Sequence, residues 1–172
     1  MKKLLLVLIW FVCLLGCKKE DFSYQSDFEK SYNAWLSFKS TSGNNYDYTV
    51  VSGSVFGFGS TTIITVINGK ITARSYEAYR IAQSPGGNTT VLKSWAEDAS
   101  SLNTHASEGA LLLTLDEVYD KAKSVWLKAD KKTNDISFVA ANNGLISACG
   151  YYPNGCQDDC FFGINIASIK AR

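Results

Sequence analysis

The chain has 172 residues, of which 46% are hydrophobic and 19% are charged. This length and composition fit one globular domain and exclude a chain that is disordered throughout. Lysines and arginines (17) nearly balance aspartates and glutamates (16). The sequence therefore offers no basic surface for a nucleic acid, and no nucleic-acid partner is expected.

The amino terminus has the layout of a secretory signal. Lys2 and Lys3 precede an apolar run from Leu4 to Leu15. As a helix at about 1.5 Å per residue this run is about 18 Å long. The hydrocarbon core of a bilayer is about 30 Å thick, so the run is too short to cross it.

The apolar run ends in Leu14-Leu15-Gly16-Cys17, which resembles the lipobox of bacterial lipoproteins. The resemblance implies a signal peptide over residues 1–16, cleavage before Cys17 and lipid attachment to its thiol. Acyl chains contribute about 0.8 kcal/mol per buried CH₂ group, enough to anchor the chain to a membrane without spanning it. Residues 17–25 are then expected to be a solvated tether, followed by a single domain over residues 26–172.

The charged tract Lys18-Lys19-Glu20-Asp21 is similar to the export tract of surface-displayed lipoproteins in some Gram-negative bacteria. We therefore expect attachment to the bacterial outer membrane through the lipid on Cys17. The periplasmic face and the outer face both remain open.

The first predicted element of the domain is a helix. Ser26 and Glu29 have the spacing of a capping box. Apolar residues then recur at helical spacing, at Phe28, Tyr32, Trp35 and Leu36. The helix is expected to end before Thr41.

From Tyr46 the apolar pattern changes to a period of two, which predicts strands over residues 46–56, 61–67 and 70–81. Asn68-Gly69 separates the last two and predicts a type I′ turn, because both residue types tolerate positive φ. These three strands predict an antiparallel meander.

The segment from Thr90 to Gly109 has a weaker pattern, in which Trp95, Ala99 and Leu102 suit a short helix. Thr114 and Glu117 form a second capping box, and the apolar stripe after it predicts a helix to about Lys128.

Residues 136–141 and 145–151 predict a second hairpin, and residues 162–166 predict a last strand. The expected fold class is α+β. We expect an antiparallel sheet, made of the three-stranded meander plus the C-terminal strands, with two or three helices packed on one face.

Four short motifs occur here in order: the aromatic helix, the strand with Tyr46, Tyr48 and Thr49, the strand-turn Val66–Ile71 and the helix start Thr114–Tyr119. In this order they resemble the DUF6174 group of small bacterial lipoproteins, and more loosely beta-lactamase-inhibitor-protein-like envelope domains. The resemblance covers Phe28 to about Phe138. It implies a fold and an envelope setting, and it implies no reaction.

Three cysteines remain once Cys13 leaves with the signal and Cys17 is lipidated: Cys149, Cys156 and Cys160. An exported domain meets an oxidising compartment, so one disulfide is expected. Cys149 and Cys160 would bridge two predicted strands, whereas Cys156 and Cys160 would close a short loop, and both pairings are open.

The same segment is also a candidate chemical site. The three thiols with Asp158 and Asp159 could bind zinc, but Cys-x6-Cys and Cys-x3-Cys are not zinc-ribbon spacings, so no metal or cofactor is expected. Cys156 paired with His105, the one histidine, is a conceivable nucleophile. His105 is more typical of an ordinary surface residue, and no catalytic set is expected.

Exposed aromatic residues give the better candidate for a binding surface. Tyr151 and Tyr152 lie in the cysteine-rich loop beside Asp158 and Asp159, and Phe56 and Phe58 lie in the first hairpin turn. A disulfide would preorganise such a loop and lower the entropic cost of recognition. The alternative is that these tyrosines fold back onto the core.

The leading hypothesis is a non-enzymatic, lipid-anchored envelope protein that binds a protein or a glycan. An inhibitor of an envelope hydrolase is an alternative by fold analogy only. Two others are an enzyme with a Cys, Asp or metal site near Cys149–Cys160, and a purely structural envelope protein.

Overall fold

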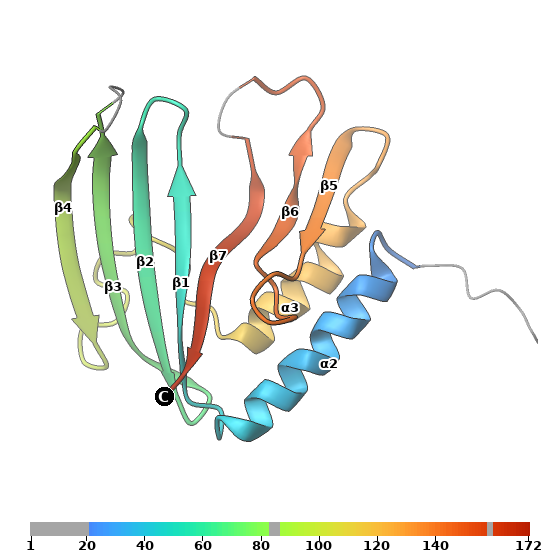
Figure 1. The fold of residues 1–172 in the computed structure, drawn as a ribbon, viewed down its shortest axis with the longest axis horizontal. Coiled ribbons are helices and arrows are strands. Elements are labelled where there is room, and N and C mark those ends of the chain that lie inside the picture. Colours follow the sequence, from blue (N-terminus) through green and yellow to red (C-terminus); the bar gives the residue numbers. More distant parts are fainter. Residues whose placement is uncertain (1–20, 83–86, 158–159) are drawn as a thin grey trace, which may run out of the picture.

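A single seven-stranded sheet dominates the computed structural model, which describes residues 21–82, 87–157 and 160–172 (Figure 1). The strands follow the order β4-β3-β2-β1-β7-β6-β5, and every neighbouring pair is antiparallel. The strands are β1 (Tyr46–Gly53), β2 (Phe58–Ile67), β3 (Lys70–Ile81), β4 (Thr89–Asp98), β5 (Asn134–Val139), β6 (Ala148–Pro153) and β7 (Phe162–Ala171).

Two α-helices lie in the described part of the chain, α2 (Gln25–Thr41) and α3 (Leu115–Ser124), and a 3₁₀ turn η2 (Trp126–Lys128) follows α3. The helices lie against the half of the sheet that contains β1, β7, β6 and β5 (Figure 1). The other half, β2 to β4, has the irregular segment 99–113 on the same face. Its Ala110 N–H donates to Thr62 Oγ1 on β2 (3.0 Å).

Two local predictions, a turn and a helix cap, are confirmed. Asn68 and Gly69 have φ of 51° and 73°, as the predicted turn requires. Thr114 caps α3 as predicted: its hydroxyl accepts the Glu117 N–H, and the Glu117 carboxylate accepts the Thr114 N–H (2.7 Å). Both signals depend on residues at most three positions apart in the sequence. The rest of the fold therefore does not override the local structure that they favour.

The predicted cap at Ser26 is wrong. Helix α2 begins at Gln25, and its N-cap Tyr24 makes no side-chain cap hydrogen bond. Glu29 instead accepts a hydrogen bond from the Gln25 side chain (2.9 Å). The packed domain also reaches back to Phe22, which is buried against the core, so it begins before Ser26.

The core between the helices and the central strands is aromatic. Trp35 is fully buried; its ring lies edge-on to Tyr46 (5.4 Å) and parallel to Tyr119 (6.2 Å). Its indole N–H donates to Asp116 Oδ1 (2.9 Å). The Tyr119 hydroxyl lies 2.8 Å from Ser31 Oγ and accepts the Ile146 N–H. These polar partners let large amphipathic side chains be buried without losing hydrogen bonds.

The predicted fold class is wrong. An α+β fold with a three-stranded meander, C-terminal strands and two or three helices on one face was expected. The meander instead has four strands, and β7 pairs with β1 to merge both groups into one seven-stranded sheet. Within the described residues there are only two α-helices, and α3 has ten residues. The fold is therefore dominated by its sheet.

The main cause of this error is the segment after Thr89. Trp95, Ala99 and Leu102 have helical spacing, yet residues 89–98 form β4 and the chain then turns. Trp95 lies opposite Tyr76, and Glu97 lies opposite Arg74 on β3. These cross-strand partners stabilise a strand, and the pattern of the segment alone does not contain them.

Cys17, the predicted signal peptide and the first residues of the predicted tether lie outside the described residues. In the part that is described, neither helix has the length and hydropathy required to cross a bilayer.

Replacing Trp35 with alanine is expected to lower the free energy of unfolding by about 3–5 kcal/mol, because it leaves a large cavity in the core. Leu36→Ala, at the neighbouring and exposed position, is the control and should change stability by less than about 1 kcal/mol. Urea unfolding followed by tryptophan fluorescence and circular dichroism measures both, and equal losses would contradict the assigned core.

Candidate functional site

The sheet splits open between β1 and β7. These strands pair only from Tyr46 to Val50 on β1 and from Ala171 to Ile166 on β7, with a register shift next to Val50. Beyond that point β1 stays paired with β2 as far as Gly53, and β7 stays paired with β6 as far as Phe162. The two strands therefore diverge toward one end of the sheet (Figure 1).

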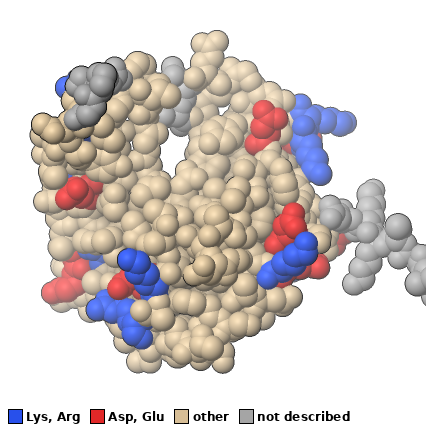
Figure 2. Space-filling view, in the orientation of Figure 1, with Lys and Arg blue, Asp and Glu red and all other residues tan. Residues whose placement is uncertain are grey.

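A cleft of about 800 Å³ lies at this split. Figure 2 shows an opening in the upper part of the surface, and no charged side chain borders it in that view. One wall comes from the β1–β2 hairpin and β3, and the opposite wall comes from β6, β7 and the residue before β7. Residues of segment 109–113 and Trp126 of η2 also line the cleft. The aromatic lining residues are Phe58, Tyr76, Tyr79, Trp126, Tyr152 and Phe161.

The lining is uncharged. Among the described residues that line the cleft, none is Lys, Arg, Asp, Glu, His or Cys. Its polar side chains include Ser52 and Ser60, whose hydroxyls lie 2.8 Å apart, and Asn165 on the opposite wall. Such a surface suits a neutral ligand that offers apolar groups together with hydrogen-bonding groups.

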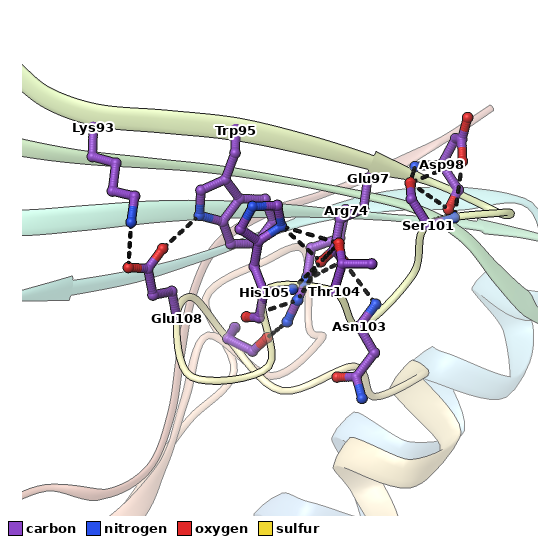
Figure 3. A network of polar contacts seen from close by, with 11 residues as sticks. Arg74, Lys93, Trp95, Glu97, Asp98, Ser101, Asn103, Thr104, His105 and Glu108 are labelled. Atoms are coloured by element: carbon purple, nitrogen blue, oxygen red, sulfur yellow. Dashed lines mark hydrogen bonds and ion pairs between the residues drawn. The ribbon is translucent and has the colours of Figure 1, made fainter.

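A buried ion pair positions segment 99–113, which contributes lining residues to the cleft (Figure 3). Arg74 on β3 and Glu97 on β4 are both buried and make two hydrogen bonds, Nε to Oε2 (3.0 Å) and Nη2 to Oε1 (3.1 Å). The Arg74 guanidinium also donates to the carbonyls of His105 (3.2 Å) and Ala110 (3.0 Å). Ala110 lines the cleft, so this pair connects the two outer strands to the site.

Glu97 binds the same segment through backbone amides. Its carboxylate accepts the N–H groups of His105 (2.7 Å) and Asn103 (3.1 Å). The Arg74 guanidinium, helped by these amides, holds the pKa of Glu97 well below its usual range. Buried charges are tolerated when paired and hydrogen-bonded in this way, and the removal of one partner is costly.

Trp95 completes the network. Its ring stacks on the His105 imidazole, with centroids 4.4 Å apart, and contacts the Arg74 guanidinium at 4.8 Å. Its indole N–H donates to Glu108 (2.9 Å), which also binds Lys93 Nζ (2.6 Å). His105, expected as an ordinary surface residue, is therefore part of the structure that fixes segment 99–113 (Figure 3).

Tyr48 holds the far end of that segment. It is fully buried, and its hydroxyl donates to the carbonyl of Leu113, another lining residue. Burial raises the pKa of Tyr48 well above its ordinary value, so the hydroxyl remains a donor across the usable pH range.

The predicted binding residues separate into four groups. Phe58 and Tyr152, about half exposed, line opposite walls of the cleft. Tyr151 precedes Tyr152 on β6 and so faces the other side of the sheet, where it stacks on Phe162 (5.4 Å). Phe56 is exposed in the β1–β2 turn and does not line the cleft. Asp158 and Asp159 lie outside the described residues.

The cysteines form one of the two pairings left open by the sequence, a disulfide between Cys156 and Cys160. The alternative bridge from Cys149 to Cys160 is wrong, since Cys149 is a buried thiol next to the core. Burial raises the pKa of Cys149 to about 12, so it is protonated at neutral pH and unsuited to act as a nucleophile. Among described residues, no three His, Cys, Asp or Glu side chains gather as a metal site.

Several site residues were missed by sequence reasoning, chiefly Trp126, Tyr76 and the pair Arg74–Glu97. The one available signal was Arg74, a charged residue on the inward-facing side of the 70–81 strand. A buried charge of this kind requires a partner of opposite charge. That partner lies on β4, whose strand character was not predicted.

A scan against protein-family models, a search of curated proteins and a search of solved structures each found no match. The resemblance to the DUF6174 group stays a prediction.

Replacing Glu97 with glutamine is expected to destabilise the fold by about 3–5 kcal/mol at pH 7, because it leaves the Arg74 charge buried without a counter-charge. The folded-state pKa of Glu97 lies below the ordinary 4.5. Its stabilisation is therefore fully present above pH 4.5 and is lost as the pH falls through that value toward the folded-state pKa.

Urea unfolding of the wild type and Glu97→Gln at pH 7, 5 and about 3 tests this linkage. The difference in unfolding free energy between them should shrink at the lowest pH. Glu77→Gln, an exposed change on the neighbouring strand β3, is the control and should follow the wild type at every pH. A difference for Glu97→Gln that is constant with pH would contradict the assigned ion pair.

Proposed function

We propose that this chain is a non-enzymatic binding module of the bacterial cell envelope, tethered to the outer membrane through a lipid on Cys17, and that the cleft between β1 and β7 holds its ligand. The ligand is an uncharged portion of a protein or a glycan. The observation that carries the proposal is a cleft of about 800 Å³ with aromatic side chains on both walls and no charged lining residue.

The size and lining of the cleft favour binding. Small-ligand sites occupy about 300–1,000 Å³ and combine apolar and aromatic walls with a few polar groups. Phe58 and Tyr152 supply the kind of partly exposed aromatic surface that contributes most at interfaces. Ser52, Ser60 and Asn165 supply hydrogen-bonding groups.

Exposed apolar residues extend this surface beyond the cleft. They lie at the end of the sheet where β1 and β7 diverge, on the β1–β2 turn, the adjacent ends of β3 and β4, and the start of β7. They are Val55, Phe56, Ile81, Val91 and Phe162. Exposed apolar residues gathered at one end of a sheet are typical of interaction sites.

The chemistry of the lining residues is that of recognition. Proton transfer needs an acid or base near the reacting group, and serine needs a neighbouring base to become a nucleophile. The described lining residues offer hydroxyl and amide groups, and none of them is a His, Asp, Glu, Lys or Cys. The alternative site near Cys149–Cys160 has a buried, protonated thiol and a disulfide.

Alanine at Tyr152 or Phe58 is expected to weaken capture of an envelope component by about tenfold or more, because each change removes an aromatic contact from the cleft. The bait is the full chain held in lipid nanodiscs, incubated with solubilised envelope, and the captured component is quantified by mass spectrometry. Leu36→Ala, which removes an exposed apolar side chain on α2, is the matched control and should capture as the wild type does. Equal capture by all four proteins would refute the cleft as the binding site.

A further inference from the structure

One wall of the cleft is the edge of a strand. The Ser54 N–H donates to the Phe58 carbonyl (2.8 Å), so Ser54, and Ser52 by alternation, direct their backbone groups toward β2. Val51 and Gly53 alternate with them and direct their N–H and C=O groups away from β2, into the cleft. In the described part of the chain, no strand pairs with β1 on that side beyond Val50.

The opposite wall is also a strand edge. The Ile166 N–H donates to the Ser147 carbonyl on the β6 side (2.7 Å), and Ile164 follows it by alternation. Gly163 and Asn165 therefore direct their backbone groups away from β6, into the cleft. Two rows of backbone donors and acceptors face one another across the split.

We propose that the ligand of the cleft is an extended polypeptide segment that inserts between β1 and β7 as an additional strand. This inference rests on the proposed binding function and names the chemical class of its ligand. Strand edges attract extended peptides because each new main-chain hydrogen bond satisfies a donor and an acceptor. Here the main-chain donors and acceptors on both sides of the inserted strand would find partners. A single sheet edge would pair only one side.

Glycines occur on both walls of the cleft. Gly53 and Gly59 lie on the β1–β2 wall, and Gly163 lies on the β7 wall. A side chain at Gly163 would collide with the carbonyl of Cys149, because β6 and β7 approach closely there. Glycine at this position therefore lets β6 and β7 lie close together at the wall of the cleft.

The geometry defines the inserted segment. Since β1 and β7 are antiparallel, a strand between them is parallel to one and antiparallel to the other. Neighbouring strands lie about 4.8 Å apart, so the walls must stand about 10 Å apart to accept it. The free edges run from Val51 to Gly53 and from Phe162 to Asn165, enough to pair three or four residues.

The chemistry of the lining selects the sequence of the segment. Without a charged lining residue, a Lys, Arg, Asp or Glu on the paired residues would enter the cleft without a counter-charge. We therefore expect a run of apolar and small hydroxyl residues. Phe58 and Tyr152 would flank it from the two walls.

The experiment uses the full chain in lipid nanodiscs and a library of capped peptides of about eight residues, built from Val, Thr, Ser, Ala, Leu and Tyr. Binders are then resynthesised with backbone N-methyl groups on alternate residues, which removes main-chain donors and leaves the side chains unchanged. Each set of alternate residues faces one wall, so methylation of either set should weaken binding by about tenfold or more. Hydrogen exchange of Val51, Gly53, Gly163 and Asn165 should slow when the parent peptide binds.

The outcomes distinguish this inference from the proposed function. Peptides that lose affinity with Tyr152→Ala but tolerate N-methylation would keep the cleft as a binding site and overturn the inserted strand. Binding of a chito-oligosaccharide probe, with no binder in the peptide library, would do the same. If neither probe binds in a manner that depends on Tyr152 or Phe58, both proposals fall.

Val51→Pro supplies a second variant. It removes a backbone N–H that points into the cleft and leaves the ladder to β2 intact. We expect an unchanged midpoint of unfolding and about tenfold weaker binding of the selected peptide. A folded Val51→Pro protein with unchanged affinity would overturn the inserted strand.

Discussion

The pairing of β1 with β7 is the constraint on which the rest of the structure depends. Its hydrogen bonds join the N-terminal meander to the C-terminal strands and bring Tyr48 and Ile166 into a shared core under the two helices. The same pairing ends next to a register shift at Val50, while each strand remains paired with its other neighbour. The cleft is therefore a direct consequence of how these two strands meet, and a β-bulge is a device that proteins commonly place beside functional sites.

The outer part of the sheet depends on a different interaction. The buried pair of Arg74 and Glu97 is stable because backbone groups of segment 99–113 complete its hydrogen bonds. A charged pair demands directional partners that an apolar contact does not, so it fixes one conformation of an otherwise irregular segment. Since Ala110 and Leu113 of that segment line the cleft, the polar network shapes an uncharged site from outside it.

A tethered module of this kind combines two separate physical functions. The proposed lipid on Cys17 would hold the domain at a membrane, and the cleft would supply selectivity through backbone edges and aromatic side chains. Exposed residues at the divergent end of the sheet add apolar area around the cleft, while the aromatic core lies between the helices and strands that include β1.

The sequence by itself determined the features encoded by neighbouring residues: the Asn68-Gly69 turn, the cap of Thr114 and Glu117, and the exposed aromatic candidates Phe58 and Tyr152. Only the tertiary structure decided that Thr89–Asp98 is a strand, that all strands form one sheet, and that the two aromatics line one cleft. The physical reason is distance along the chain. A turn or a cap is stabilised by residues a few positions apart, whereas strand pairing and the partner of a buried charge are selected by burial across the whole molecule.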